Sequence, residues 1–268
     1  MESLIVDGPV LLDLLDDGVA HLQLNRPAAA NGLNLELLHS LHKALMRCHS
    51  DARVRALLLT GAGANFCAGG DVRAFAAEGA QLTYHIREAT SYLHEIIGVM
   101  IHLEAPVVVA VQGFAAGGGG LGLMCAADLV IAAESAKFLA GATRVAMAPD
   151  AGLSVTLPRL VGPRKAAEML LLNTTVTAAE ALAIGLINRI VPDAELANAA
   201  LTCAAEVARG APLALGATKR LLWNGIGLGV DAVAPEESRT VADLCRTDDV
   251  REGLAAVIEK RTPRFTGR

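Results

Sequence analysis

Residues 105–127 read APVVVAVQGFAAGGGGLGLMCAA and decide how this chain folds. The stretch has no charged residue, and by length alone it is long enough to span a bilayer. However, it combines Pro106 and the β-branched run Val107–Val109 with six glycines between Gly113 and Gly122. This order is typical of a buried strand, a glycine-rich turn and a buried helix in series. The sequence therefore predicts part of the protein core here and no membrane segment.

A strand, a glycine-rich turn and a helix also follow one another earlier in the chain. Val54–Thr60 is a buried-type strand, and residues 65–71 (NFCAGGD) form a turn that opens a helix. The repetition predicts an α/β core of stacked β-turn-α units. Further strands are expected at 19–24, 129–133 and 188–191, and helices at 35–48, with Asn34 as N-cap, and at 81–103.

After Pro192 the pattern becomes helical. Helices are expected over 194–209, 212–223, 235–245 and 249–260. We therefore expect two parts, a core over residues 1–193 that carries the functional site and a helical C-terminal region over residues 194–268.

Composition excludes several classes of protein. Of the 268 residues, 53% are hydrophobic and 3% aromatic, with a net charge of −5, which argues against intrinsic disorder and nucleic-acid binding. The five cysteines are an odd number without metal-ligand spacing, so neither a disulfide framework nor a metal site is expected. Residues 1–10 lack the basic start of a signal peptide, so we expect a cytoplasmic protein.

The two glycine-rich turns are the first candidates for chemistry. Gly69–Gly70 and Gly117–Gly120 each lie between a strand and a helix, where main-chain N–H groups point outward at the positive end of the helix dipole. Two such turns can direct two N–H groups at one oxygen and form an oxyanion hole. Two alternatives remain. The glycines can serve close packing, or the run can bind a dinucleotide, although no acidic ribose ligand follows it.

Asp150 is the second candidate, because it is the only carboxylate between Lys137 and Pro158. A carboxyl group in apolar surroundings has a raised pKa and can exchange a proton near neutral pH. The alternative interpretation is a turn, since Pro-Asp-x-Gly is favourable turn chemistry.

Taken in order, these motifs resemble the crotonase, or enoyl-CoA hydratase/isomerase, superfamily. Residues 24–27 (LNRP) and 31–34 (NGLN) are similar to the family's opening, and residues 65–71 to its F-x-A-G-x-D turn. The run from Ala110 to Gly120 is similar to its A-V-x-G-x-x-x-G-G-G loop. The resemblance continues through PDAG at 149–152 to the tail EKRTPRF at 259–265. It implies a crotonase-like spiral of ββα units and a helical C-terminal region that makes trimers, often paired into hexamers.

The resemblance assigns roles to particular residues. The first oxyanion N–H falls on Gly70 and the second on Gly118 or Gly119, because the glycine run is one residue longer than usual. The two glutamates of the family's hydratases are absent: Leu121 or Gly122 takes the first place and Ala142 the second. Isomerase-like branches instead carry an Asp where this chain has Asp150.

The resemblance also implies an acyl-CoA substrate, with coenzyme A as part of the substrate and no permanently bound cofactor. Ala28, Ala30 and Ala68 would contact the adenine through their backbone, and Lys260 would reach a CoA phosphate from a neighbouring subunit. The sequence departs from the family where Ala28–Ala30 replaces charged residues and where Val257 replaces an aromatic residue.

We therefore predict an enoyl-CoA isomerase in which Asp150 alone moves a proton and converts a 3-enoyl to a 2-enoyl thioester. One alternative is an enoyl-CoA hydratase, with Asp150 alone or with an acid such as Glu78 or Glu88. An alternative of another class is a non-catalytic acyl-CoA-binding member of the family.

Overall fold

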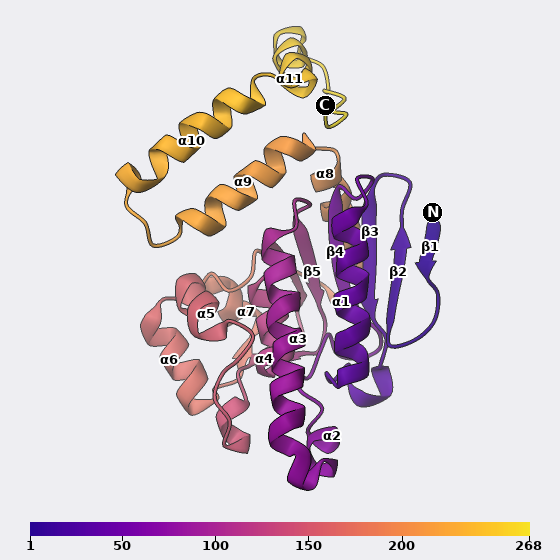
Figure 1. Cartoon of the computed structure of the whole chain (residues 1–268), viewed down its shortest axis with the longest axis vertical. Coiled ribbons are helices and arrows are strands. Elements are labelled where there is room, and N and C mark those ends of the chain that lie inside the picture. The colour runs from indigo at the N-terminus through magenta and orange to yellow at the C-terminus, as the bar shows by residue number, and fades with distance from the viewer.

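A seven-stranded sheet forms the centre of the molecule, and the computed structural model describes all residues 1–268 around it (Figure 1). Its strands lie in the order β1-β2-β3-β4-β5-β7-β10. The first three are antiparallel, and from β3 onward neighbouring strands are parallel. The bounds are β1 Glu2–Ile5, β2 Val10–Leu14, β3 Val19–Leu24, β4 Ala56–Gly61, β5 Val107–Val111, β7 Leu129–Ala133 and β10 Arg189–Val191.

Helices cover both faces of this sheet, as expected for a parallel sheet with nearly continuous apolar strands. On one face α1 (Leu35–Ser50) and α3 (Leu82–His102) pack side by side over alternate residues of β2 to β5. On the other face α8 (Leu196–Ala208) covers the remaining alternate residues of β3, β4, β5 and β7. β5 is buried along its whole length because it lies in the middle of these layers.

The predicted strand-turn-helix order of residues 105–127 is confirmed. β5 is followed by α4 (Gly117–Cys125), and the short strand β6 (Phe114–Ala116) lies between them. The Asn34 side chain caps α1 by accepting a hydrogen bond from the N–H of Leu37 at 3.0 Å. The predicted helix over 81–103 is also confirmed as α3.

Several short elements were not expected from the sequence. β6 pairs with β8 (Lys137–Leu139) and β9 (Val176–Thr177) in a second, three-stranded sheet. These strands have two or three residues each, too few to show an alternating pattern. The helices α2 (Val72–Ala77), α5 (Leu153–Val161), α6 (Pro163–Leu172) and α7 (Ala178–Ala183) complete the core.

The last three helices extend away from the core as an arm (Figure 1). The arm comprises α9 (Pro212–Gly225), α10 (Val230–Leu244) and α11 (Asp248–Glu259). α10 contains Pro235 in its interior, whereas the helix predicted from the sequence began at Pro235. α8 lies beyond residue 193 yet packs on the sheet, so only α9 to α11 leave the core. No helix has the length and the apolar character needed to cross a bilayer.

A buried polar cluster attaches the arm to the core. The Lys219 ammonium of α9 lies 2.8 Å from Asp128 Oδ2 and donates to Met100 O at 2.7 Å. Asp128 also accepts from Trp223 Nε1 at 3.1 Å and from the N–H of Val107 at 2.7 Å. The cluster therefore joins α9, the end of α3 and the beginning of β5.

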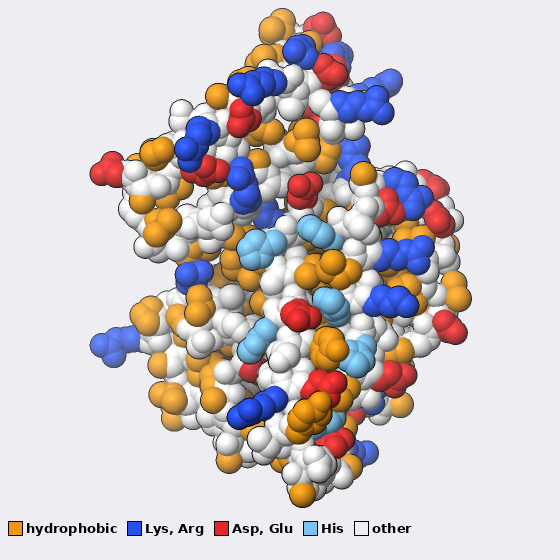
Figure 2. All heavy atoms as spheres, viewed as in Figure 1, with side chains coloured by type: hydrophobic (Ala, Val, Ile, Leu, Met, Phe, Trp, Pro, Cys, Tyr) orange, Lys and Arg blue, Asp and Glu red, His pale blue; other side chains and the backbone are white.

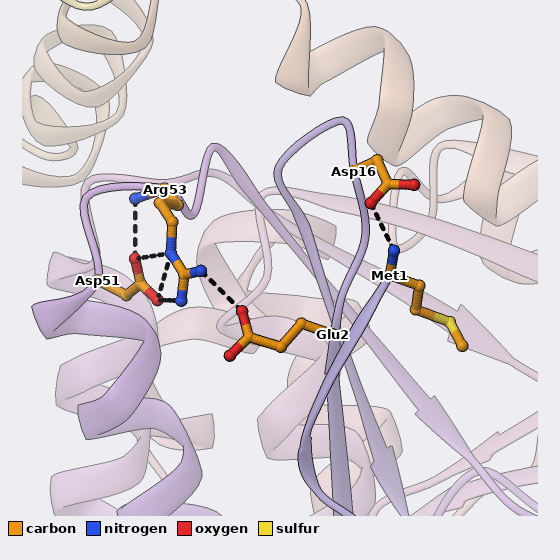
Figure 3. A network of polar contacts seen from close by, with 5 residues as sticks. All are labelled: Met1, Glu2, Asp16, Asp51 and Arg53. Atoms are coloured by element: carbon orange, nitrogen blue, oxygen red, sulfur yellow. Dashed lines mark hydrogen bonds and ion pairs between the residues drawn. The ribbon is translucent and has the colours of Figure 1, made fainter.

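Exposed ion pairs hold the N-terminal edge strand (Figure 3). Arg53 contacts Glu2 at 2.7 Å and Asp51 at 2.6 Å, and the terminal amine lies 2.5 Å from Asp16. Water and salt screen such pairs, so they orient β1 but add little to stability.

Candidate active site

One cavity brings together the residues that the sequence analysis singled out as catalytic. It has a volume of about 270 Å³, and 14 of its 22 lining residues are hydrophobic. Gly70, Gly118, Gly119 and Asp150 all line it, together with Ala68. Its walls come from the turn before α2, the first turn of α4, one side of α3 and the segment from Leu139 to Asp150.

Asn31 fixes the turn that carries Gly70. The Asn31 side chain is fully buried and donates to the carbonyls of Ala62, Asn65 and Phe66 at 2.9, 2.8 and 3.0 Å. The backbone of Leu33 then bonds on both sides of Gly70, to Gly69 O at 2.8 Å and from the N–H of Asp71 at 2.9 Å. The N–H of Gly70 itself donates to no protein acceptor. It is a free hydrogen-bond donor at the cavity wall.

Arg26 and Asp71 hold the residues next to Gly70. Their side chains form an ion pair at 3.1 Å, and Arg26 also donates to Gly32 O. Asp71 in turn caps α2 by accepting from the N–H of Ala74 at 3.1 Å. Burial alone would raise the pKa of Asp71, but these hydrogen bonds and the Arg26 charge outweigh it, so the pKa lies below its ordinary value.

The glycine run forms the first turn of α4. The N–H groups at the start of an α-helix have no acceptor one turn earlier, and they lie at the positive end of the helix dipole. A Cβ at Gly120 would overlap the backbone oxygen of Cys67, so close packing of the two turns requires glycine there. A Cβ at Gly118 would instead overlap the Asp150 carboxylate. Gly120 is therefore needed for close packing of the two turns, and Gly118 is the glycine of the run that lies against Asp150.

Asp150 belongs to a turn through its backbone and lines the cavity. Its carbonyl accepts from the N–H of Leu153 at 2.9 Å, while its side chain is half-buried beside Gly118. Loss of water raises the pKa of this carboxyl group, and its own backbone N–H and the charge of His94 partly oppose the rise. An acid of this kind can accept and return a proton.

Asp150 is the only carboxylate that lines the cavity, and Arg144 is the only cation. Ala142, where a hydratase glutamate would stand, also lines it, whereas Leu121 and Gly122 do not. Glu78 and Glu88 lie outside the lining as well, and Glu78 pairs with the buried His85 at 3.1 Å.

Three residues near the site were not assigned a role from the sequence. The Phe75 ring packs directly against Gly70, and Arg144 lines the cavity. A charge on His94 lowers the pKa of Asp150. Phe75 lies on the helix that Asp71 caps, so its position relative to that cap was a usable signal. Figure 2 shows histidines gathered on the face formed by α1 and α3, and no spacing in the sequence separates His94 from the others.

The residues expected to bind CoA are divided between two places. Ala68 lines the cavity, and its N–H donates to Ala30 O at 3.0 Å, so Ala30 lies directly behind it. Ala28 and Ala30 are outside the cavity lining. Lys260 follows α11 in the arm and is exposed.

Cys67 is fully buried, which raises the pKa of its thiol to about 12 and excludes it as a nucleophile.

Known proteins are similar to this chain over nearly its whole length. The family model described as Enoyl-CoA hydratase/isomerase matches residues 15–268. A probable enoyl-CoA hydratase from Rhodobacter capsulatus is 40% identical over 95% of this chain and 96% of that protein. The 1,2-epoxyphenylacetyl-CoA isomerase of Escherichia coli is 33% identical over 96% and 98%.

A solved structure shows the same fold. The crystal structure of an enoyl-CoA hydratase from Bacillus anthracis matches with a TM-score of 0.92 and 34% identity, covering 97% of this chain and 100% of that one. The predicted crotonase-type α/β fold with a helical C-terminal region is thus confirmed. The chain belongs to the enoyl-CoA hydratase/isomerase family and is an enzyme of the crotonase type.

Proposed function

We propose that this enzyme moves the double bond of an enoyl-CoA thioester from the 3- to the 2-position. The observation that carries the proposal is that Asp150 is the only carboxylate in the cavity and lies against Gly118, in the same cavity as the free N–H of Gly70. Isomerisation needs one group that takes a proton and returns it. Hydration ordinarily uses a second group to position water, and no second carboxylate lines the cavity.

The proposed mechanism has two proton transfers. The Asp150 carboxylate removes a proton from C2 of the 3-enoyl thioester, and the resulting dienolate carries its negative charge on the thioester oxygen. The N–H groups of Gly70 and of Gly118 or Gly119 donate to that oxygen. Loss of one such donor typically costs about 2.7–4 kcal/mol of transition-state stabilisation. Asp150 then returns the proton to C4, which leaves the 2-enoyl product and restores the carboxylate.

Gly118 is the better candidate for the second donor, because it is the glycine in direct contact with Asp150. Gly119 packs instead against Leu33 and Gly69.

Hydration of a 2-enoyl-CoA is the second candidate function. The name of the Rhodobacter relative, probable enoyl-CoA hydratase, favours it. For this reaction Asp150 would have to activate the water by itself or with an acid from outside the present lining, such as Glu78 or Glu88.

The test is an assay with two substrates, crotonyl-CoA and a 3-enoyl-CoA, with products identified by mass and by chromatography. We expect the 3-enoyl-CoA to give its 2-enoyl isomer at unchanged mass. Asp150→Asn should lower this rate by at least about 100-fold, the lower end of the usual contribution of an acid-base group. Glu88→Gln is the matched control and should retain activity. Addition of water to crotonyl-CoA as the faster reaction would contradict the proposal.

We further propose that the CoA moiety contacts the backbone of Ala28, Ala30 and Ala68, and that Lys260 of a neighbouring subunit contacts its phosphate in a homotrimer or a pair of trimers. Exposed apolar side chains on the arm support this assembly, since they leave apolar surface to be covered (Figure 2). They include Leu222, Val230, Leu254, Val257 and Ile258. Light scattering on the eluting protein should give a mass three or six times that of the chain.

A further inference from the structure

Arg144 is a charged residue that the proposed mechanism does not use. It lies in the short helical turn Ala142–Val145, within the segment that forms one wall of the cavity. The other residues that this segment contributes before Asp150 are uncharged: Leu139, Gly141, Ala142, Val145, Met147 and Ala148. Arg144 is exposed to solvent, and it is the one cation that contributes to this mainly apolar lining.

The contacts of Arg144 leave most of its guanidinium group available. One nitrogen, Nη2, donates to the carbonyl of Asn173 at 2.9 Å, and no other side-chain hydrogen bond or ion pair is formed. Asn173 ends α6, so this bond fixes the side chain against a rigid element. A guanidinium group has five N–H donors, and the remaining ones can bind a carboxylate through two parallel hydrogen bonds.

Asp150 lines the same cavity but does not pair with Arg144. A substrate carboxylate would be repelled by the Asp150 carboxylate and attracted by Arg144, so it would bind away from the reacting carbons. Together the two side chains would favour an anionic group at the Arg144 side of the cavity only.

We propose that Arg144 binds a carboxylate at the far end of the acyl chain, and that the preferred substrates are ω-carboxyacyl-CoA thioesters. The inference rests on the proposed acyl-CoA site and adds the substrate class.

Binding of saturated thioesters tests the inference without requiring turnover. The probes are hexanoyl-CoA and the ω-carboxyl thioesters glutaryl-, adipoyl- and suberyl-CoA, with dissociation constants measured by calorimetry. Arg144→Met should weaken the best ω-carboxyl ligand by about tenfold or more, as expected for a hydrogen bond to a charged group. Hexanoyl-CoA should bind the variant as it binds the wild type. Arg144→Lys should restore part of the loss, because lysine keeps the charge without the planar donor geometry.

Arg164→Met is the matched control, because Arg164 is exposed on α6 and lies outside the cavity lining. It should leave every dissociation constant unchanged. An equal loss for hexanoyl-CoA and the ω-carboxyl ligands in Arg144→Met, or no loss at any chain length, would overturn the inference.

A second experiment distinguishes binding of the acyl carboxylate from binding of the CoA phosphates, which present similar oxygens. The measurement is repeated with adipoyl-pantetheine, which lacks those phosphates. A persistent loss in Arg144→Met supports the acyl carboxylate. A loss confined to the full CoA thioesters would assign Arg144 to CoA and overturn the inference. If no enoyl-CoA is turned over while the Arg144 effect persists, only the proposed isomerase function fails.

Discussion

Asp150 lies where its charged form is disfavoured, because burial raises the pKa of its carboxyl group above the ordinary value. Folding therefore becomes less favourable as the pH rises from the ordinary pKa through the raised one. Asp150→Asn removes that cost. We expect the variant to be inactive yet to unfold at a temperature equal to or above that of the wild type at pH 8, with the difference shrinking toward pH 4. Calorimetric scans at the two pH values measure this, and a variant less stable at pH 8 would contradict it.

His94 also affects the pKa of Asp150. A positive charge on His94 lowers the pKa of Asp150, which opposes the effect of burial. In His94→Gln that opposition is lost, so the pKa of Asp150 should rise further. The acid limb of the pH–rate profile should then move to higher pH, while the rate on the high-pH plateau stays near that of the wild type. His102→Gln is the control, since His102 lies on the same helix and does not influence Asp150.

At the scale of elements, the first turn of α4 offers a direct comparison of two glycines. Gly118→Ala places a methyl group on the Asp150 carboxylate, a side chain that can move, so activity should fall much more than stability. Gly120→Ala places it on the backbone oxygen of Cys67, which cannot move without disturbing the turn before α2. Overpacking of this kind typically costs about 1–3 kcal/mol of unfolding free energy.

Chemical denaturation and the isomerase assay, applied to both variants, separate the two effects. Equal losses of stability in Gly118→Ala and Gly120→Ala would show that the two glycines serve packing alike.

The long elements were predictable from the sequence because each satisfies its own local pattern. α1 has the Asn34 cap and a leucine face, and β5 has its β-branched run. The short strands β6, β8 and β9 were not predictable, since their pairing depends on contacts between distant segments. The same reason explains why motifs singled out Asp150 and Gly70, whereas Arg144 and His94 reach the site only through tertiary packing.

At the scale of the whole molecule, the arm depends on the buried pair Lys219–Asp128. The Lys219 side chain is 4% exposed, and burial lowers the pKa of its ammonium group despite the attraction of Asp128. Lys219→Met would leave Asp128 charged and unpaired, which typically costs about 3–5 kcal/mol.

We expect Lys219→Met to lower the free energy of unfolding by about that amount, and the double variant Lys219→Met, Asp128→Asn to recover part of it. Trp223 is the single tryptophan and touches Asp128, so its fluorescence reports on the cluster during urea unfolding. Lys165→Met, which removes a half-buried surface pair with Glu168 within one helix, is the control and should change little. An unaffected Lys219→Met would show that the arm is held by apolar contacts instead.

The buried cluster also limits how this protein can be recombined with its relatives. Lys219 and Trp223 belong to the arm, whereas Asp128 follows α4 and bonds to the first residue of β5. A chimera that takes its arm from one parent and its core from another would combine parts of two different clusters. This is avoided only if Asp128, Lys219 and Trp223 all come from the same parent. Because α4 and β5 also lead to the two sides of the glycine turn, such a mismatch would extend to the cavity that Gly118 and Asp150 line. Crossover points for domain shuffling are therefore better placed outside the segment from residue 128 to residue 223.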